Sequence, residues 1–139
     1  MTAPSSPEAP VNETAVKVWC RHNHGWFSEA GVVHIIAGVG MPTPDYPYSG
    51  LDAQAALALG ISLTDGIPRP VVGDMRRVRR TETAARRVKP NHLVKALAIF
   101  VESPVTRMLA NAYLGITRPE QPTKVSTSTD AALNWLTAH

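Results

Sequence analysis

The apolar stretch V-K-A-L-A-I-F-V at residues 94–101, between Pro90 and Pro104, most constrains the fold of this chain. It is the most hydrophobic stretch in the sequence, and its length suits a buried strand, which we expect at the centre of a sheet. A second short run, P-V-V-G-D-M at residues 70–75, lacks the alternation of a half-exposed strand. Such a run is typical of an inner strand covered on both faces. The two runs together predict an α/β protein with a mostly parallel sheet.

The chain before these runs predicts an N-terminal β-hairpin. Residues 15–21 alternate in polarity, as a half-buried strand does. Two further apolar runs, at residues 26–27 and 32–37, flank a turn and would form the two strands of the hairpin. Gly31 supplies the positive φ that such a turn needs. We expect four to five strands in all, the last of them at residues 123–127.

Helical spacing alternates with the strands. Capping residues and prolines predict where the helices begin and end. Residues 38–50 contain three prolines and must form a loop. We expect about four helices: one at residues 51–65 with Ser49 as N-cap, one capped by Thr81 that ends before Pro90, one at residues 103–115 with Ser103 as N-cap, and one after Thr127 or Ser128.

Length and composition indicate one globular domain. The chain has 139 residues, 44% hydrophobic and 18% charged, which is enough to bury a core without disulfides. We assign residues 1–12, rich in Pro, Ser and Ala, to a flexible tail, and residues 13–139 to a single domain.

The sequence also predicts a cytoplasmic protein. Its single cysteine, Cys20, cannot form an internal disulfide, which agrees with a reducing compartment. No apolar run approaches the roughly 20 residues of a membrane span, and the N-terminus lacks the features of a signal peptide.

The charges are unevenly distributed. Seven of the fourteen basic residues lie within residues 76–89, where Glu82 alone opposes them, although the net charge is only +3. In an α/β protein, the loop after an inner strand is where binding usually occurs. We therefore predict a docking surface for a protein partner, formed by Asp74, Arg76, Arg77, Arg79, Arg80 and Glu82. An acidic surface on that partner would suit these charges. The alternative for Asp74 is that it hydrogen-bonds the backbone of the following loop.

Much of the chain resembles a known family. The segments P-V-V-G-D-M-R-R-V, A-L-A-I-F-V-E-S-P-V-T-R-M-L-A-N-A-Y-L-G-I-T-R-P, P-T-K-V and A-A-L-N-W-L, with the hairpin W-F-S-E-A-G-V-V-H-I-I, resemble the small bacterial STAS-like or SpoIIAA-like domains of unknown function. The resemblance covers roughly residues 25–138. It implies an α/β sheet with helices packed against it, and relatives that act in protein–protein regulation.

The best-known branch of that fold, the anti-sigma factor antagonists, is phosphorylated on a serine at the start of a helix. The branch has an Asp-Ser-Ser/Thr-Gly pattern, and the matching positions here are Glu82, Thr83, Ala84 and Ala85. The acidic residue and one hydroxyl are retained, whereas the second hydroxyl and the glycine are not. The resemblance therefore implies Thr83 as the candidate phosphoacceptor of a regulatory switch, with an ordinary first-turn threonine as the alternative.

Other classes of function have weaker support in the sequence. No nucleophile with a base, no phosphate loop and no cofactor motif is recognisable, so we expect a domain that is not an enzyme and needs no cofactor. A nucleic-acid partner is disfavoured because no aromatic side chains are interleaved with the arginines. The main alternative is a small apolar ligand or lipid, held under the loop at residues 38–50 with its two tyrosines as a lid.

Three further features leave alternatives open. Cys20, His22 and His24 would share a face of an extended strand, but three ligands fall short of a structural zinc site, and we assign no metal. Trp19 shares a face of the expected strand with Lys17 and Arg21, and if exposed there it can form a homodimer contact. His34 lies on an apolar strand and is expected to be a core histidine.

Overall fold

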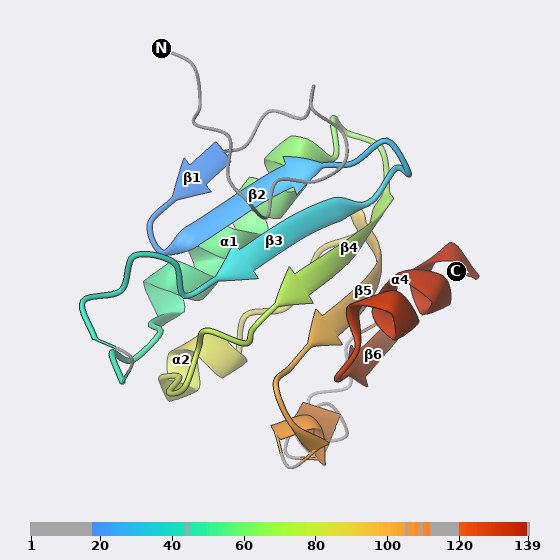
Figure 1. Cartoon of the computed structure of the whole chain (residues 1–139). Helices are drawn as coiled ribbons and strands as arrows, with labels where there is room; N and C mark the ends of the chain where they lie inside the picture. The colour runs from blue at the N-terminus through green and yellow to red at the C-terminus, as the bar shows by residue number, and fades with distance from the viewer. Residues whose placement is uncertain (1–17, 44, 105, 109, 112–119, 139) are drawn as a thin grey trace.

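The computed structural model describes residues 18–43, 45–104, 106–108, 110–111 and 120–138. Their central feature is one sheet of six strands, in which the order across the sheet is the order along the chain (Figure 1). The strands are β1 (Val18–Cys20), β2 (Asn23–Phe27), β3 (Val33–Ala37), β4 (Arg69–Asp74), β5 (Val94–Phe100) and β6 (Thr123–Ser126).

The pairing of the strands confirms the predicted α/β class. β1, β2 and β3 pair antiparallel, and β3 to β6 pair parallel. The sheet has six strands rather than the expected four to five, because the runs expected at residues 15–21 and 26–27 both contribute strands, β1 and β2, to the one sheet. β5 is an inner strand, as predicted, but it lies beside the edge strand β6 rather than at the centre.

Helices cover the two faces of the sheet in different places. α1 (Gly50–Leu63) packs behind β1, β2 and β3, and α4 (Thr129–Thr137) packs in front of β4, β5 and β6 (Figure 1). α2 (Thr83–Arg86) lies against α1. The helix expected at residues 103–115 is described only in part. Residues 104, 106–108, 110 and 111 are helical, and residues 105, 109 and 112–115 lie outside the described chain.

The core consists of one hydrophobic cluster on each face. Val71 and Val72 are neighbours in β4, and their side chains enter different clusters because successive side chains in a strand point to opposite faces. One cluster lies under α1 and contains Val33, Ile35, Leu59, Val71 and Val94. The other lies under α4 and contains Val32, Val72, Ala96, Ala98, Ala132 and Leu136.

Several predicted turns and caps are confirmed. Gly31, between β2 and β3, has φ +80°. The hydroxyl of Ser49 accepts a hydrogen bond from the Asp52 N–H at 3.0 Å and so caps α1. Ser103 and Ser128 accept equivalent bonds from the N–H groups of Thr106 and Ala131. Each hydroxyl satisfies a backbone donor that has no partner within its helix.

The helix expected between Thr81 and Pro90 is wrong in both its cap and its length. α2 contains only four residues, its N-cap is Glu82, and no side chain caps it. Thr81 instead forms an isolated bridge with Tyr48. After α2, Arg87 and Val88 bond to carbonyls three residues back, a tighter pattern than an α-helix. The approach to Pro90 disfavours helical backbone, so the chain leaves the helix early.

None of the described helices has the length and apolar character needed to cross a membrane. The predicted tail at residues 1–12 and the side chain of Trp19 lie outside the part of the chain that the structure describes.

Candidate functional site

The predicted docking residues lie on a loop at the carboxyl end of β4. This loop, residues 75–80, is called the arginine loop here. The side chains of Arg76, Arg77, Arg79 and Arg80 are all exposed. Ligands of open parallel sheets usually bind at the carboxyl ends of the strands. The position of the arginine loop therefore agrees with a binding surface.

Asp74 holds the start of the arginine loop. Its Oδ1 accepts hydrogen bonds from the N–H and the Nε–H of Arg76, both at 3.0 Å, and its Oδ2 accepts from Nη2 at 2.8 Å. The guanidinium of Arg76 also lies 4.4 Å from the centre of the Phe100 ring. The alternative given for Asp74, a hydrogen bond to the backbone of the following loop, is confirmed. Arg76 is thus engaged within the protein, although its side chain is half exposed.

Tyr48 holds the end of the same loop. The N–H of Tyr48 donates to the carbonyl of Arg80, and the N–H of Glu82 donates to the carbonyl of Tyr48, both at 2.9 Å. Because Tyr48 is 97% buried, it is a firm anchor. The loop is therefore fixed at both ends while Arg77, Arg79 and Arg80 extend into solvent.

A buried polar cluster positions Tyr48. The tyrosine hydroxyl donates to Asn23 Oδ1 and, at 3.2 Å, to the carbonyl of Asp52. The amide of Asn23 donates to the carbonyls of Cys20 and Asp52. Burial and the nearby Asp52 carboxylate raise the pKa of Tyr48 far above its usual range. The hydroxyl therefore stays protonated and able to donate.

Asp52 is the charged centre of this cluster and is fully buried. Its Oδ1 accepts from Arg21 Nε and from His22 Nδ1 at 2.9 Å each. Its Oδ2 accepts from the N–H and the hydroxyl of Ser49. Burial acts to raise the pKa of Asp52, but the hydrogen bonds from Ser49, Arg21 and His22 outweigh it and lower that pKa to about 2. Asp52 is thus ionised at neutral pH.

The sequence interpretation did not identify Asp52 as an important residue. One signal for it was present, because Ser49 and Asp52 have the spacing of a capping box, and both of its bonds form. Arg21 and His22 lie about thirty positions away in the chain. Their convergence on Asp52 depends on the packing of α1 against the first hairpin.

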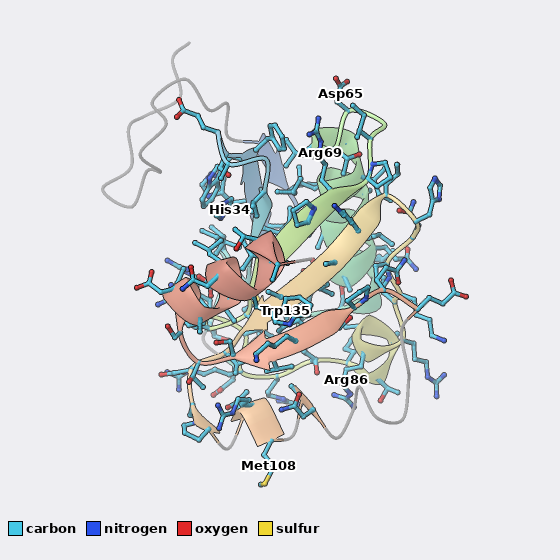
Figure 2. The ribbon with its side chains drawn as sticks, turned by 90° about the vertical axis from the view of Figure 1, so that its right-hand side faces the viewer. His34, Asp65, Arg69, Arg86, Met108 and Trp135 are labelled. Atoms are coloured by element: carbon cyan, nitrogen blue, oxygen red, sulfur yellow. The ribbon has the colours of Figure 1, made fainter. Side chains whose placement is uncertain are left out.

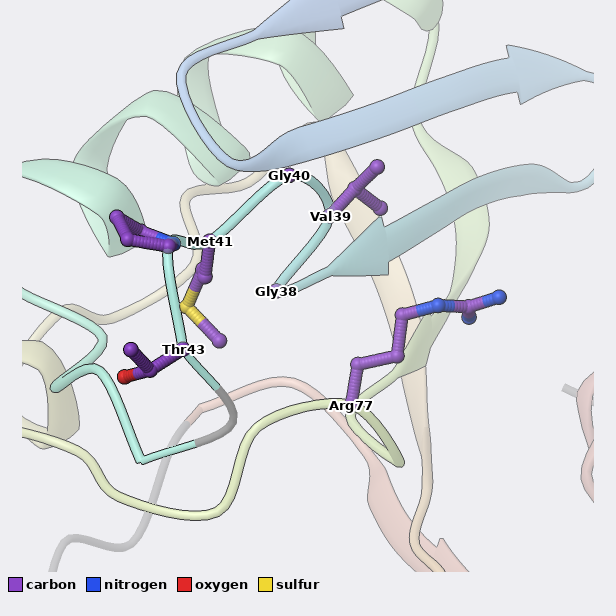
Figure 3. Close-up of a pocket in the computed structure, with 7 residues that line it drawn as sticks. Gly38, Val39, Gly40, Met41, Thr43 and Arg77 are labelled. Carbon is purple, nitrogen blue, oxygen red and sulfur yellow. The ribbon is translucent and has the colours of Figure 1, made fainter.

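A shallow pocket lies beside the arginine loop (Figure 3). Its volume is about 280 Å³, and its lining consists of Gly38, Val39, Gly40, Met41, Pro42, Thr43 and Arg77. Gly38 has φ +82°, and an added Cβ would meet Arg77 and Val78 at about 3 Å, so glycine is required for the two loops to approach. Drug-sized ligands usually occupy pockets of about 300 to 1,000 Å³ that are mostly apolar, so this pocket is small for one.

The lid predicted for an apolar ligand is not formed by Tyr48. That side chain belongs to the buried polar cluster and does not line the pocket. Tyr46 is 37% exposed, and its ring packs edge-on against His22. The two tyrosines of the proline-rich loop therefore stabilise the hairpin and helix α1.

Thr83, the candidate phosphoacceptor, is exposed at the first position of α2. Its hydroxyl lies 3.4 Å from Arg86 Nη2, while Arg86 Nη1 donates to the carbonyl and hydroxyl of Thr81. Glu82 Oε1 lies 3.4 Å from the N–H of Gly50. A helix of one turn has little dipole, so the environment of Thr83 depends on Arg86 rather than on the helix.

The premise behind a Cys20, His22 and His24 site is wrong. Arg21 has φ +52° and turns the chain between β1 and β2, so the three residues do not share one extended strand. His22 is bonded to Asp52. Across the described residues, no three His, Cys, Asp or Glu side chains are grouped closely enough to hold a metal ion.

His34, labelled in Figure 2, is half-buried and stacks on Trp26. The two rings are 4.8 Å apart and nearly parallel, with an angle of 6° between their planes. Burial lowers the pKa of His34 to about 4, so it is neutral at pH 7. The expected core position is therefore met only in part, because His34 is half-buried against Trp26 and belongs to neither core cluster.

The mixed sheet with helices on both faces is an α/β fold, and the predicted SpoIIAA-like resemblance is confirmed at the level of the fold. A similar solved structure is an uncharacterized protein of the DUF3478 family with a SpoIIAA-like fold from Shewanella loihica PV-4. It is 12% identical over 88% of this chain and 92% of its own, with a TM-score of 0.51. At this identity, the similarity shows the fold alone.

The chain belongs to the family described as Domain of unknown function (DUF7793), whose model matches residues 44–139. A protein of unknown function from Arthrobacter sp. FB24 is 26% identical over 83% of this chain and 99% of its own, with a TM-score of 0.30. No curated protein matches the sequence.

Proposed function

We propose that this protein is a non-enzymatic regulatory domain that binds an acidic protein partner through the arginine loop. The observation that carries the proposal is a loop fixed at both ends that presents three exposed arginines. Asp74 fixes one end, Tyr48 fixes the other, and Arg77, Arg79 and Arg80 extend outward. A loop that is already ordered loses less conformational entropy on binding than a mobile one.

The chemistry of the loop favours carboxylates as the partner's contacts. A guanidinium presents a planar set of donors that matches a carboxylate in two parallel hydrogen bonds. Arginine is also enriched at the energetically dominant positions of protein interfaces. Two of the nearby acidic residues are partly engaged, since Asp74 pairs with Arg76 and Glu82 approaches Gly50. An acidic surface would therefore find the remaining cations available.

Phosphorylation of Thr83 is a natural means of regulating such a surface. Its exposed hydroxyl lies next to Arg86, and the residue comes three positions after the end of the arginine loop. A phosphoryl group there would add close to two negative charges. It would attract Arg86 and compete with the acidic partner for the basic surface.

The experiment is a pull-down of the tagged protein from extract of its own cells, treated with nuclease, followed by intact-mass analysis. We expect a stoichiometric protein partner that is lost from R79E/R80E. Loss is expected because two attractive charge contacts become repulsive. Arg76 is left unchanged in the variant because its contacts with Asp74 and Phe100 stabilise the loop.

K95E/K124E is the matched control. It makes the same change in net charge at exposed positions on β5 and β6, away from the arginine loop. It should keep the partner. Equal retention by both variants would show that the surface is wrongly assigned. Recovery of the protein without a protein partner but with a small bound molecule would favour the apolar-ligand alternative instead. An added phosphate on Thr83 would support the switch.

A further inference from the structure

The pocket beside the arginine loop combines apolar surface with a single charge. Val39, Met41 and Pro42 supply the apolar surface, and Arg77 is the one charged residue of the lining. Figure 3 shows the Met41 side chain reaching into the space between its own loop and the arginine loop, whereas the Arg77 guanidinium extends away from Met41. The stem of Arg77 therefore lines the pocket, and its charge lies at the rim.

The charge of Arg77 is available to a partner. Among the described residues, none forms an ion pair with it. Asp74 pairs with Arg76 instead, and this hydrogen bond together with the charge of Glu102 raises the pKa of Arg76. Asp45 is exposed in the proline-rich loop, outside the lining. A bound carboxylate would therefore lie on the Arg77 side of the pocket.

Both walls of the pocket are held by hydrogen bonds. The N–H of Val39 donates to the carbonyl of His22 at 2.9 Å, which fixes one wall to the turn between β1 and β2. The N–H of Tyr46 donates to the carbonyl of Thr43 at 3.1 Å. The opposite wall is the arginine loop, which is fixed at both ends. A pocket that is ordered before binding loses less conformational entropy when it is filled.

We propose that this pocket receives one apolar side chain of the acidic partner, adjacent to a carboxylate in the partner's chain. This inference rests on the proposed function and adds to it the chemistry of the contact. The apolar group packs on Met41 and on the stem of Arg77, and the neighbouring carboxylate meets the Arg77 guanidinium in two parallel hydrogen bonds. Interfaces commonly combine an anchor side chain in a pocket with polar contacts around it.

The size and shape of the pocket favour a side chain over a free ligand. Its volume of about 280 Å³ is below the range of about 300 to 1,000 Å³ that drug-sized ligands usually occupy. Because the pocket is shallow, a free molecule would leave much of its surface in water. A side chain inserted from outside is supported by the contacts that its neighbours make with the arginine loop.

Titration of the ¹⁵N-labelled full chain with the peptide acetyl-Gly-Asp-Leu-Asp-Gly-amide tests the pocket. We expect the amide chemical shifts of residues 38–43 and 77 to change, with dissociation at about 1 mM. Alanine in place of the leucine removes the anchor, and asparagine in place of both aspartates removes the charges. Each change should weaken binding by about fivefold or more, because each removes one of the two contacts.

Variants of the protein locate the two contacts. M41E should weaken binding by about tenfold or more, because it places a carboxylate where the leucine enters. M108E is the matched control, since it makes the same change at an exposed methionine outside the lining, and it should bind as the wild type does. R77M keeps the stem beside Gly38 and removes the charge. It should weaken binding of the aspartate peptide and leave binding of the asparagine peptide unchanged. Thermal melts establish that each variant is folded.

The contrary outcomes separate this inference from the proposed function. Equal binding of the leucine and alanine peptides, with both lost from R79E/R80E, would overturn the pocket contact and leave the acidic docking in place. Absence of binding of the leucine peptide at about 5 mM would also overturn it, and the pull-down would still decide the proposed function. Binding of N-acetyl-leucinamide as tightly as the peptide would assign the pocket to a free small molecule instead.

Discussion

At the scale of single residues, Asp52 connects the candidate site to the core. Its carboxylate joins Arg21, His22 and Ser49, and its carbonyl accepts from Tyr48, which in turn holds the end of the arginine loop. A fully buried carboxylate is costly unless hydrogen bonds compensate for lost hydration. The hydrogen bonds to Asp52 compensate for the lost hydration well enough to keep its carboxylate ionised at neutral pH.

Replacement of Asp52 by asparagine should lower the free energy of unfolding by roughly 2 to 3 kcal/mol. The asparagine amide lacks the negative charge with which Arg21 pairs. Its NH₂ group would also stand where the carboxylate oxygen accepts from the Ser49 N–H, so that two donors would face each other. Urea denaturation monitored by tryptophan fluorescence at pH 7 measures the change. An unchanged free energy of unfolding would mean that the cluster contributes no net stability.

The acid dependence of the same variant checks the cause. The pKa of Asp52 is about 2 in the folded protein and 3.8 as its ordinary value. The carboxylate therefore stabilises the fold above pH 3.8, and this contribution is lost as the pH falls through about 2. The difference in stability between wild type and D52N should shrink over that range. The same difference at pH 2 and pH 7 would contradict the assignment.

At the scale of elements, α1 shows a substitution that the fold should accept. Gly60 lies in its interior, facing the sheet, and an added Cβ would lie about 4.0 Å from Ile35, an ordinary contact distance. Glycine inside a helix is less favourable than alanine by up to about 1 kcal/mol. We expect G60A to raise the free energy of unfolding by up to this amount, as measured from the midpoint of urea denaturation.

Gly66 offers a control with the opposite sign. Its φ of +75° belongs to the left-handed region, where an alanine is strained although the surrounding space is open. G66A should therefore lower the stability. A destabilised G60A would show that the space between α1 and β3 is tighter than the structure indicates.

The elements also show where sequence patterns predict structure and where they do not. The hairpin around Gly31, the strands β4 and β5 and the caps Ser49 and Ser128 follow from local spacing and local hydrogen bonds. The N-cap of α2 does not, because Thr81 is drawn into a bridge with Tyr48, over thirty positions earlier in the chain. Local helix signals were outweighed there by tertiary pairing.

The candidate site was predictable in part for the same reason. The clustered arginines are visible in the sequence, and their exposure on a loop follows from the preceding strand. The anchoring of that loop by Tyr48, and of Tyr48 by Asn23 and Asp52, joins distant segments. No local pattern specifies such contacts, and the sequence alone therefore predicts only that Tyr48 lies in a loop that could cover a ligand.

At the scale of the whole molecule, stability should fall on mild acidification. His34 has a pKa of about 4 in the fold, against an ordinary value of 6.5, because burial disfavours its charged form. Below pH 6.5 the unfolded chain binds a proton that the folded chain does not, so stability decreases as the pH falls toward about 4. H34F keeps an aromatic ring beside Trp26 and removes the titration.

We therefore expect the free energy of unfolding of H34F to vary less than that of the wild type between pH 6.5 and 4. Urea denaturation at several pH values measures this slope. The exposed His92 provides the control, and H92Q should keep the slope of the wild type. An identical slope for H34F and wild type would show that His34 titrates normally in the folded protein.

The order of the strands has a consequence for how this protein acquires its structure. Because every strand pairs with strands adjacent to it in the chain, the sheet can grow at one edge during synthesis. Each new strand finds the preceding strand already in place when it leaves the ribosome. The two antiparallel pairings close short loops, which generally form fast, whereas the parallel pairing of Val33 with Val71 closes a crossover of 38 positions and should form more slowly. A nascent chain that ends after β4 would already contain four paired strands with α1 available to cover them.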